Sequence, residues 1–154
     1  MKGQDMETDT ALAGQQRPDA GITHRVCYAD TDAGGYVYHA RYIEFAEHAR
    51  NQLMYAAGYS FASLASAHGV MLVVHRVEAQ HHLPARLEDS LSLRARIAWC
   101  RPSKSRWVTE ARRGDALLAT ITIDMVALNV RTRELARHPE PFLAALLDVG
   151  QAQA

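Results

Sequence analysis

Two aspartates and a histidine lie close together in the segment YADTDAGGYVYHARYIEFAEHAR, which spans residues 28–50. Asp30 and Asp32 come just before a Gly-Gly pair, and His39 follows the turn that these glycines allow. A carboxylate can act as a general base on water, or it can attack a carbonyl carbon itself. The segment therefore contains groups that suit acyl transfer, provided that a carbonyl can be bound and polarised beside them.

A helix is predicted directly after these polar residues, over about residues 39–57. Apolar side chains recur there at helical spacing, at Tyr42, Phe45, Ala46, Ala49, Leu53 and Ala56. The free N–H groups of a first helical turn carry partial positive charge and can stabilise an oxyanion. Losing one such donor typically costs about 3–4 kcal/mol of transition-state stabilisation. A purely structural interpretation also fits, in which the aspartates are caps, Gly-Gly is a turn, and Tyr38 and His39 are packed.

The rest of the chain is predicted to form one antiparallel sheet and two short helices. A helix with one apolar face must pack against such a sheet, which predicts an α+β domain with a long helix on a curved sheet. We expect this domain over residues 21–148, between a flexible N-terminal arm (1–20) and a tail (149–154). Helices are expected over 60–68, between Ser60 and Gly69, and over 139–149, and strands over 22–28, 70–80, 90–99, 106–113 and 116–130.

Composition excludes several classes of protein. Lysine plus arginine equals aspartate plus glutamate, at 17 each in 154 residues, so no bulk charge calls for nucleic acid or an anionic membrane. No apolar run resembles a signal peptide or a membrane span. Cys27 and Cys100 have neither disulfide nor metal spacing, which indicates reduced thiols and a cytoplasmic protein.

Four histidines between residues 68 and 82 raise the question of a metal site. His81 and His82 are adjacent on a predicted strand, so their side chains point to opposite faces and cannot easily share an ion. His75 and His81 also face opposite ways if that strand has no bulge. We therefore predict no metal site, and interpret these histidines as surface or interface residues.

The segment over residues 28–50 closely resembles the signature of hotdog-fold acyl-CoA thioesterases of the 4-hydroxybenzoyl-CoA thioesterase type. It is similar in particular to the branch known as the Tol-Pal-system-associated acyl-CoA thioesterases. Their signature runs Tyr, any residue, Asp-Thr-Asp, a glycine-containing turn, Val-Tyr-His, and then a helix with Glu-Arg-Ala-Arg. Two later stretches agree in order, PARLEDSL (84–91) and GDALLATITIDMVALNVRTRELAR (114–137), so that the resemblance covers residues 22–142.

This resemblance implies a hydrolase that converts an acyl-CoA to the free acid and coenzyme A, with no separate cofactor. The family's catalytic aspartate falls on Asp32, as nucleophile or as general base, and Asp30 becomes a partner that caps the turn. The His39 backbone N–H would polarise the thioester carbonyl, while its ring and Tyr28 would orient substrate or water. Gly35 and Tyr38 are expected to contact the substrate.

Glu47 is a reserve candidate for the catalytic carboxylate, because other hotdog thioesterases use a glutamate on this helix. The interpretation that we favour for Glu47 is a surface ion pair with Arg50 or Arg41. Two residues depart from the family pattern: His48 replaces an arginine, and His82 replaces a tyrosine near the expected acyl pocket or dimer seam.

Three basic residues, Arg101, Lys104 and Arg106, lie between two predicted strands and could hold the phosphates of coenzyme A. The alternative is an ordinary solvated hairpin turn, but relatives bind the nucleotide with basic residues near this hairpin. We therefore expect coenzyme A contact here.

One sheet and one long helix leave an open sheet edge, which predicts a homodimer, and the resemblance implies a homotetramer of two dimers. Three alternatives remain open from the sequence. The substrate could be an acyl group on acyl carrier protein, or an aromatic acyl-CoA. The protein could also be a non-catalytic acyl-binding or scaffold protein with the same fold.

Overall fold

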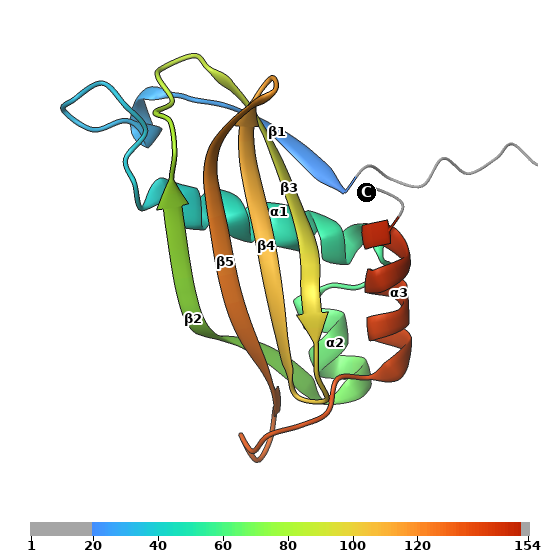
Figure 1. Cartoon of the computed structure of the whole chain (residues 1–154). Coiled ribbons are helices and arrows are strands. Elements are labelled where there is room, and N and C mark those ends of the chain that lie inside the picture. The colour runs from blue at the N-terminus through green and yellow to red at the C-terminus, as the bar shows by residue number, and fades with distance from the viewer. Residues whose placement is uncertain (1–19, 152–154) are drawn as a thin grey trace, which may run out of the picture.

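The computed structural model of the chain describes residues 20–151, which form one sheet with helices beside it (Figure 1). The predicted arm over residues 1–20 lies outside the described residues except for Ala20, which is buried. In chain order the elements are β1 (Gly21–Arg25), a 3₁₀ turn (Tyr28–Asp30), α1 (Arg41–Ala56), α2 (Phe61–His68), β2 (Val70–His81), β3 (Ser90–Cys100), β4 (Lys104–Arg113), β5 (Ala116–Asn129) and α3 (Glu140–Gln151).

The five strands are all antiparallel and lie in the order β1-β3-β4-β5-β2. α1 crosses one face of the curved sheet and contacts β1, β3, β4 and β5 (Figure 1). α3 packs against α1 and β3, and α2 packs against β2. This arrangement confirms the predicted α+β architecture, in which a long helix packs on a curved antiparallel sheet.

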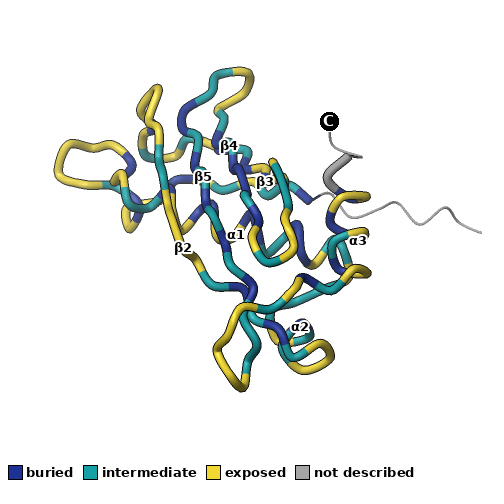
Figure 2. The backbone as a smooth tube through the Cα atoms, turned by 60° about the horizontal axis from the view of Figure 1, so that its bottom comes forward, coloured by how far each residue is buried: buried dark blue, intermediate teal, exposed yellow. Residues whose placement is uncertain are grey.

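The predicted periodicity explains why α1 packs where it does. Phe45, Ala49 and Leu53 recur every fourth residue and are fully buried against the sheet, whose inner side contributes Leu91 and Trp107. Figure 2 shows this distribution as buried backbone where α1 meets the strands and exposed backbone along the loops. The first turn of α1 has no side-chain cap, since its N-cap residue is Ala40.

The short helix α2 follows its predicted boundaries. The Ser60 side chain accepts a hydrogen bond from the Ser63 N–H, which satisfies one free donor of the first turn. Gly69 ends the helix in the left-handed conformation, with φ of 64°. Both signals were present in the sequence and both predictions are confirmed.

Two strands differ from their predicted form. β1 ends at Arg25 rather than Tyr28, because the Asp30 carboxylate accepts a hydrogen bond from the Cys27 N–H and bends the chain into the 3₁₀ turn. In β3 buried residues alternate with more exposed ones from Leu91 to Ala95, but a bulge between Ile97 and Trp99 shifts the register, which a strand predicted from its range alone does not show. Trp99 is half-buried at the end of the strand.

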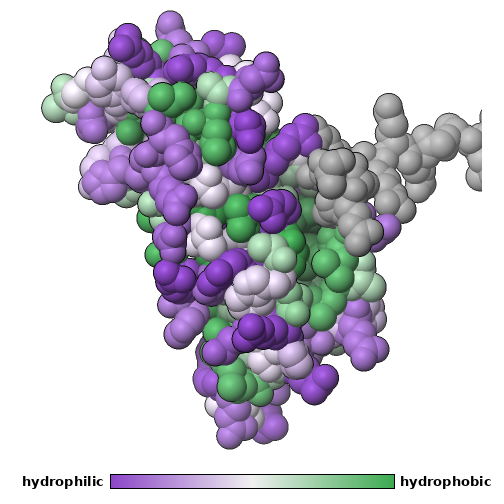
Figure 3. Space-filling view, in the orientation of Figure 1, coloured by the Kyte–Doolittle hydropathy of each residue, from purple (hydrophilic) through white to green (hydrophobic). Residues whose placement is uncertain are grey.

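One face of the molecule is mostly polar. Figure 3 shows hydrophilic residues over much of this face and an apolar area beside α3, the helix that carries the exposed Leu147. Within residues 20–151, no helix is long and apolar enough to cross a membrane.

Candidate active site

Asp30 is a fully buried carboxylate that joins three parts of the chain. It accepts hydrogen bonds from the Cys27 N–H at 2.9 Å, from His24 Nε2 at 2.7 Å and from Arg41 Nη2 at 2.8 Å. Burial acts to raise its pKa, but these donors together outweigh burial and hold the pKa well below the ordinary value of 3.8. Asp30 thereby ties β1 and the 3₁₀ turn to the start of α1, and the expectation that it caps the turn is confirmed.

Asp32, two residues later, lies in an exposed turn. Its Oδ1 accepts a hydrogen bond from the Gly34 N–H at 2.8 Å, whereas its other carboxylate oxygen has no donor among residues 20–151. The turn is closed by backbone hydrogen bonds from the Asp32 N–H to the Tyr36 carbonyl and from the Gly35 N–H to the Asp32 carbonyl. Gly35 has φ of +78°, in the left-handed region that favours glycine. The turn leaves one face of the Asp32 carboxylate open to reactants.

His39 lies immediately before α1. Its backbone N–H donates to no acceptor among the described residues, so it is free to bind a ligand oxygen. The His39 ring packs against Tyr38, with ring centroids 4.4 Å apart. The centroid of the His81 ring, at the end of β2, lies 6.4 Å from that of the His39 ring.

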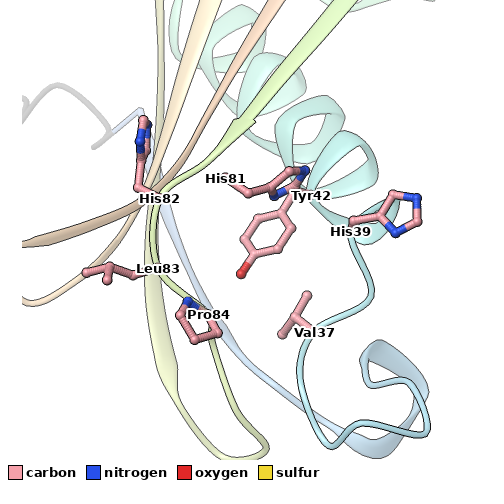
Figure 4. Close-up of a pocket in the computed structure, with 7 residues that line it drawn as sticks. All are labelled: Val37, His39, Tyr42, His81, His82, Leu83 and Pro84. Carbon is pink, nitrogen blue, oxygen red and sulfur yellow. The ribbon is translucent and has the colours of Figure 1, made fainter.

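A cavity of about 280 Å³ opens between the start of α1 and the end of β2 (Figure 4). The ring of Tyr42, from the first turn of α1, meets the ring of His81 nearly edge-on at 5.3 Å. His82 extends to the other side of the strand, where its Nε2 lies 3.2 Å from Thr120 Oγ1. The wall is formed by Val37, His39, Tyr42, His81, His82, Leu83 and Pro84.

The electrostatics of this cavity favour an uncharged group. Burial, and then the neighbouring His39 and His82, lower the pKa of His81, so its imidazole is neutral at pH 7. Burial raises the pKa of Tyr42, so the phenol stays protonated. The cavity can thus offer an acyl group apolar side chains and the neutral rings of Tyr42 and His81, with His39 also in its wall.

The prediction that His81 and His82 point to opposite sides of the strand is confirmed, although both border the cavity. The prediction for His75 is wrong, because residues six apart on a regular strand share a face, and β2 in addition has a bulge between Val74 and Arg76 that interrupts the alternation at His75. Within residues 20–151, no three histidine, cysteine or acidic side chains lie close enough together to hold a metal ion.

The predicted site residues divide into those that the fold brings together and those that it keeps apart. His39 borders the cavity and its ring packs against Tyr38, which is not part of the wall, and Gly35 shapes the turn that carries Asp32. Tyr28 is 81% exposed in the 3₁₀ turn and is not part of the cavity wall. Asp32 does not border the cavity within this chain either.

The favoured interpretation of Glu47 as a partner of Arg50 or Arg41 is wrong. Arg41 pairs with Asp30 and Glu44. Arg50 lies on the buried side of α1, and no ion pair joins it to Glu47, which lies on the exposed side.

The basic residues of the predicted coenzyme A contact lie at the other end of the sheet. Lys104 is level with Val73 near the start of β2, because both residues pair with Val126 of β5, whereas His81 ends that strand. The guanidinium groups of Arg101 and Arg106 both lie over the Trp99 ring, at 5.0 and 5.3 Å from its centroid. Arg106 is also held by Asp124 through bonds of 2.6 and 2.8 Å, which leaves Arg101 and Lys104 as the freer cations.

A second cavity, of about 270 Å³, lies beside this hairpin and contains residues that the sequence reasoning missed. Arg101 shares it with Arg137 and His138, which precede the first residues of α3. His138 is only 5% exposed, and burial lowers its pKa. The signal available in the sequence was an arginine and a histidine just before the proline that precedes α3. Tyr42 was missed at the first cavity because its helical spacing marked it only as a core residue.

Comparison with known proteins now places this geometry in a family. Residues 26–146 match the thioesterase-like superfamily. The chain belongs to this superfamily. A probable thioesterase from Bartonella henselae has a similar structure, with a TM-score of 0.71, 29% identity, and 77% of this chain and 98% of that chain covered. The hotdog fold implied by the sequence resemblance is thereby confirmed.

Two curated relatives show how far the likeness extends along the chain. An acyl-CoA thioester hydrolase, YbgC, of Escherichia coli is 42% identical over 73 residues, which are 47% of this chain and 54% of that protein. The chain thus spans about half the length of this relative. The acyl-CoA thioesterase YbgC of Haemophilus influenzae is 26% identical over 79% of this chain and 89% of that protein.

Proposed function

We propose that the protein hydrolyses the thioester of an acyl-CoA to the free acid and coenzyme A. The observation that carries this proposal is the pairing of an open carboxylate, Asp32, with an unpaired backbone N–H, that of His39, at the two ends of one short turn segment. Acyl transfer requires both groups, a base or nucleophile and an oxyanion donor. The superfamily and its curated relatives named acyl-CoA thioesterases support the same reaction.

The proposed reaction begins with the thioester carbonyl oxygen accepting a hydrogen bond from the His39 N–H. Asp32 then either removes a proton from an attacking water or attacks the carbonyl carbon itself. In both routes the carbon–sulfur bond breaks and coenzyme A leaves as the thiolate. In the second route water then cleaves the acyl–Asp32 anhydride. The rings of Tyr42, His39 and His81 suit an acyl group that can pack on aromatic faces, so aromatic acyl-CoAs belong among the substrates to test.

A homodimer is part of the proposal, because one chain leaves the site incomplete. Asp32 does not border the cavity of its own chain, and β2 pairs only with β5, which leaves its outer edge open within the described residues. Val74 and Val77 are exposed on β2, and Ile43 is exposed on α1. Pairing of two copies along β2 would cover this edge and bring the two sites close to each other's chains. Two such dimers would form the tetramer that the resemblance implies.

Coenzyme A is proposed to be held by Arg101 and Lys104 at the β3–β4 hairpin. Arg106 contributes indirectly. Its guanidinium is already bonded to Asp124, and it packs over the Trp99 ring. Because this hairpin lies far from the cavity of its own chain, the nucleotide would contact the chain that does not hold the acyl group. We place the protein in the cytoplasm, where acyl-CoAs occur and where both of its free cysteines would stay reduced.

The deciding experiment measures thiol release from short, medium and long aliphatic acyl-CoAs and from benzoyl-CoA types, for wild type, Asp32→Asn and Glu47→Gln. We expect hydrolysis by wild type, a loss of orders of magnitude in Asp32→Asn, and nearly normal rates in Glu47→Gln. The reverse order for the two variants would transfer the catalytic role to Glu47. If wild type releases no thiol from any acyl-CoA, the same panel on acyl carrier protein tests the alternative carrier. Binding without release there would indicate an acyl-binding protein.

A further inference from the structure

The turn that carries Asp32 lies against the segment that joins β2 to β3. Tyr36, at the closing end of the turn, forms an antiparallel bridge with Arg86 of that segment. The Tyr36 carbonyl also accepts the hydrogen bond of 2.9 Å from the Asp32 N–H that closes the turn. Any group that fixes Tyr36 therefore acts on the part of the turn from which the Asp32 carboxylate extends.

The Arg86 side chain lies over the Tyr36 ring. Its guanidinium carbon is 5.4 Å from the ring centroid, and Nη2 donates to the Tyr36 hydroxyl at 3.4 Å. Within residues 20–151 this guanidinium makes no other hydrogen bond and no ion pair. A cation is attracted to the negative face of an aromatic ring. Arg86 thus directs the polar contacts of its side chain to the turn that carries the proposed catalytic carboxylate.

The backbone of Arg86 is itself held in place by Asp89. The Asp89 carboxylate accepts hydrogen bonds from the Arg86 N–H at 2.8 Å and from Arg113 Nη1 at 2.6 Å. The bond from the Arg86 N–H, ahead of that from Arg113, lowers the pKa of Asp89, so the carboxylate is ionised at neutral pH. Arg113, the last residue of β4, also donates to the Pro84 carbonyl at 3.4 Å. Arg86 is therefore anchored to the sheet and can act as a fixed support.

Little apolar packing holds the turn itself. Residues 32–36 are all exposed, and the chain becomes buried only at Val37, whose N–H donates to the Ala85 carbonyl at 2.9 Å. Figure 4 shows Val37 and Pro84 on the cavity wall, where the two segments meet. Segments with few buried contacts open at a low cost in free energy. A contact at the closing end of the turn therefore has a large influence on where the carboxylate lies.

We propose that Arg86 is a positioning residue for the proposed thioester hydrolysis. By holding the Tyr36 ring, it fixes the closing end of the turn and so the direction in which Asp32 presents its open carboxylate oxygen. The proposal rests on the proposed role of Asp32, and it assigns Arg86 no contact with the substrate. Displacing a reacting group by about 1 Å can cost roughly 10²-fold in rate, so a looser turn should affect turnover rather than substrate affinity.

The test compares thiol release by wild type, Arg86→Met, Arg86→Lys and Arg96→Met, with the acyl-CoA that wild type hydrolyses fastest. We expect the kcat of Arg86→Met to fall roughly tenfold, with KM changed by less than about twofold. Arg86→Lys should restore part of the loss, because an ammonium group can also lie over the ring. Arg96→Met, which removes an exposed arginine from β3, should match wild type. A loss of kcat in Arg86→Met no greater than in Arg96→Met would overturn the proposal.

A double variant separates action through Tyr36 from an independent effect. Tyr36→Leu removes the ring that Arg86 covers, so Arg86→Met should lower kcat little further in that background. Fully additive losses would mean that Arg86 does not act through Tyr36. A raised KM with unchanged kcat in Arg86→Met would also overturn the proposal, because Arg86 would then bind the substrate.

Amide NMR spectra test the positioning without any turnover. The amides of Asp32 and Gly34 donate within the turn, to the Tyr36 carbonyl and to Asp32 Oδ1, and they should shift in Arg86→Met but not in Arg96→Met. Unchanged turn amides in Arg86→Met would refute the positioning role whatever the activity. If wild type releases no thiol but these amides shift, the proposed hydrolysis fails, while the finding that Arg86 holds the turn is supported.

Discussion

Asp30 and Asp32 are separated by a single residue, yet they occupy opposite environments. Asp30 is fully buried and bonded to Cys27, His24 and Arg41. Asp32 is exposed and accepts one hydrogen bond, from the Gly34 N–H of its own turn. The Asp30 carboxylate therefore already uses its oxygens in hydrogen bonds within the fold. The Asp32 carboxylate keeps one oxygen available for a reactant.

The comparison also explains why the two carboxylates cannot exchange roles. The donors around Asp30 hold its pKa well below the ordinary value, so that it is a poor base near neutral pH. Its lone pairs point at Arg41 and the Cys27 N–H rather than at a cavity. Asp32 sits instead on a turn whose geometry is set by Gly35, ahead of the free N–H of His39.

The largest expected effect is on turnover by Asp32→Asn. An asparagine keeps a side-chain carbonyl to accept the Gly34 N–H, so the turn survives while the base or nucleophile is lost. We expect a reduction in kcat of roughly 10²–10⁴-fold, the range for a positioned acid–base group, with an unchanged circular dichroism spectrum. Wild-type turnover in Asp32→Asn would show that the open carboxylate is not the reactive one.

Asp30→Asn is expected to act on stability instead. Removing one partner from a buried charged network leaves Arg41 and the remaining donors incompletely bonded, at a cost of about 3–5 kcal/mol in the free energy of unfolding. Urea denaturation of Asp30→Asn beside Asp32→Asn measures the difference directly. Equal midpoints for the two variants would remove the distinction between a structural and a reactive aspartate.

The dependence of stability on pH should separate the same two residues. Because the folded-state pKa of Asp30 is depressed, its contribution is complete above the unfolded pKa near 3.8 and is lost as pH falls toward the folded pKa. Wild type should therefore lose stability faster than Asp30→Asn as pH falls below about 4. Asp89 and Asp124, whose pKa values are also lowered, remain in both proteins, so their effect cancels in the difference. Parallel stability curves would contradict this assignment.

The smallest expected effects come from the two glycines of the turn. Gly35→Ala places a side chain at φ of +78° where no atom lies within 4 Å, so it should cost only backbone strain, about 1–2 kcal/mol. In Gly34→Ala the new Cβ would lie 3.1 Å from Asp32 Oδ1 and would push the carboxylate aside. Thiol release should therefore fall more in Gly34→Ala, and thermal unfolding should shift more in Gly35→Ala. The opposite pattern would mean that the turn does not position Asp32.

Much of the fold could be predicted because the apolar spacing and the cap residues in the sequence match the residues that are buried and the ends of the helices. The apolar spacing of Phe45, Ala49 and Leu53 located α1, and the Ser60 and Gly69 signals bounded α2. Where prediction failed, a hydrogen bond or a bulge that the hydrophobic pattern does not encode decided the outcome. The hydrogen bond from the Cys27 N–H to Asp30 ends β1 at Arg25, and the bulge after Ile97 shifts the register at the end of β3.

The types and the order of the reactive groups were determined by the sequence alone, since turn residues, carboxylates and a helix start are all local features. Only the tertiary structure decided which aspartate is buried, because the donors from His24 and Arg41 come from a strand and a helix on either side of the motif. It also decided that His81 closes a cavity against Tyr42 and that Arg86 lies over the Tyr36 ring. These outcomes depend on packing between elements, and burial of a charge is a property of the whole fold.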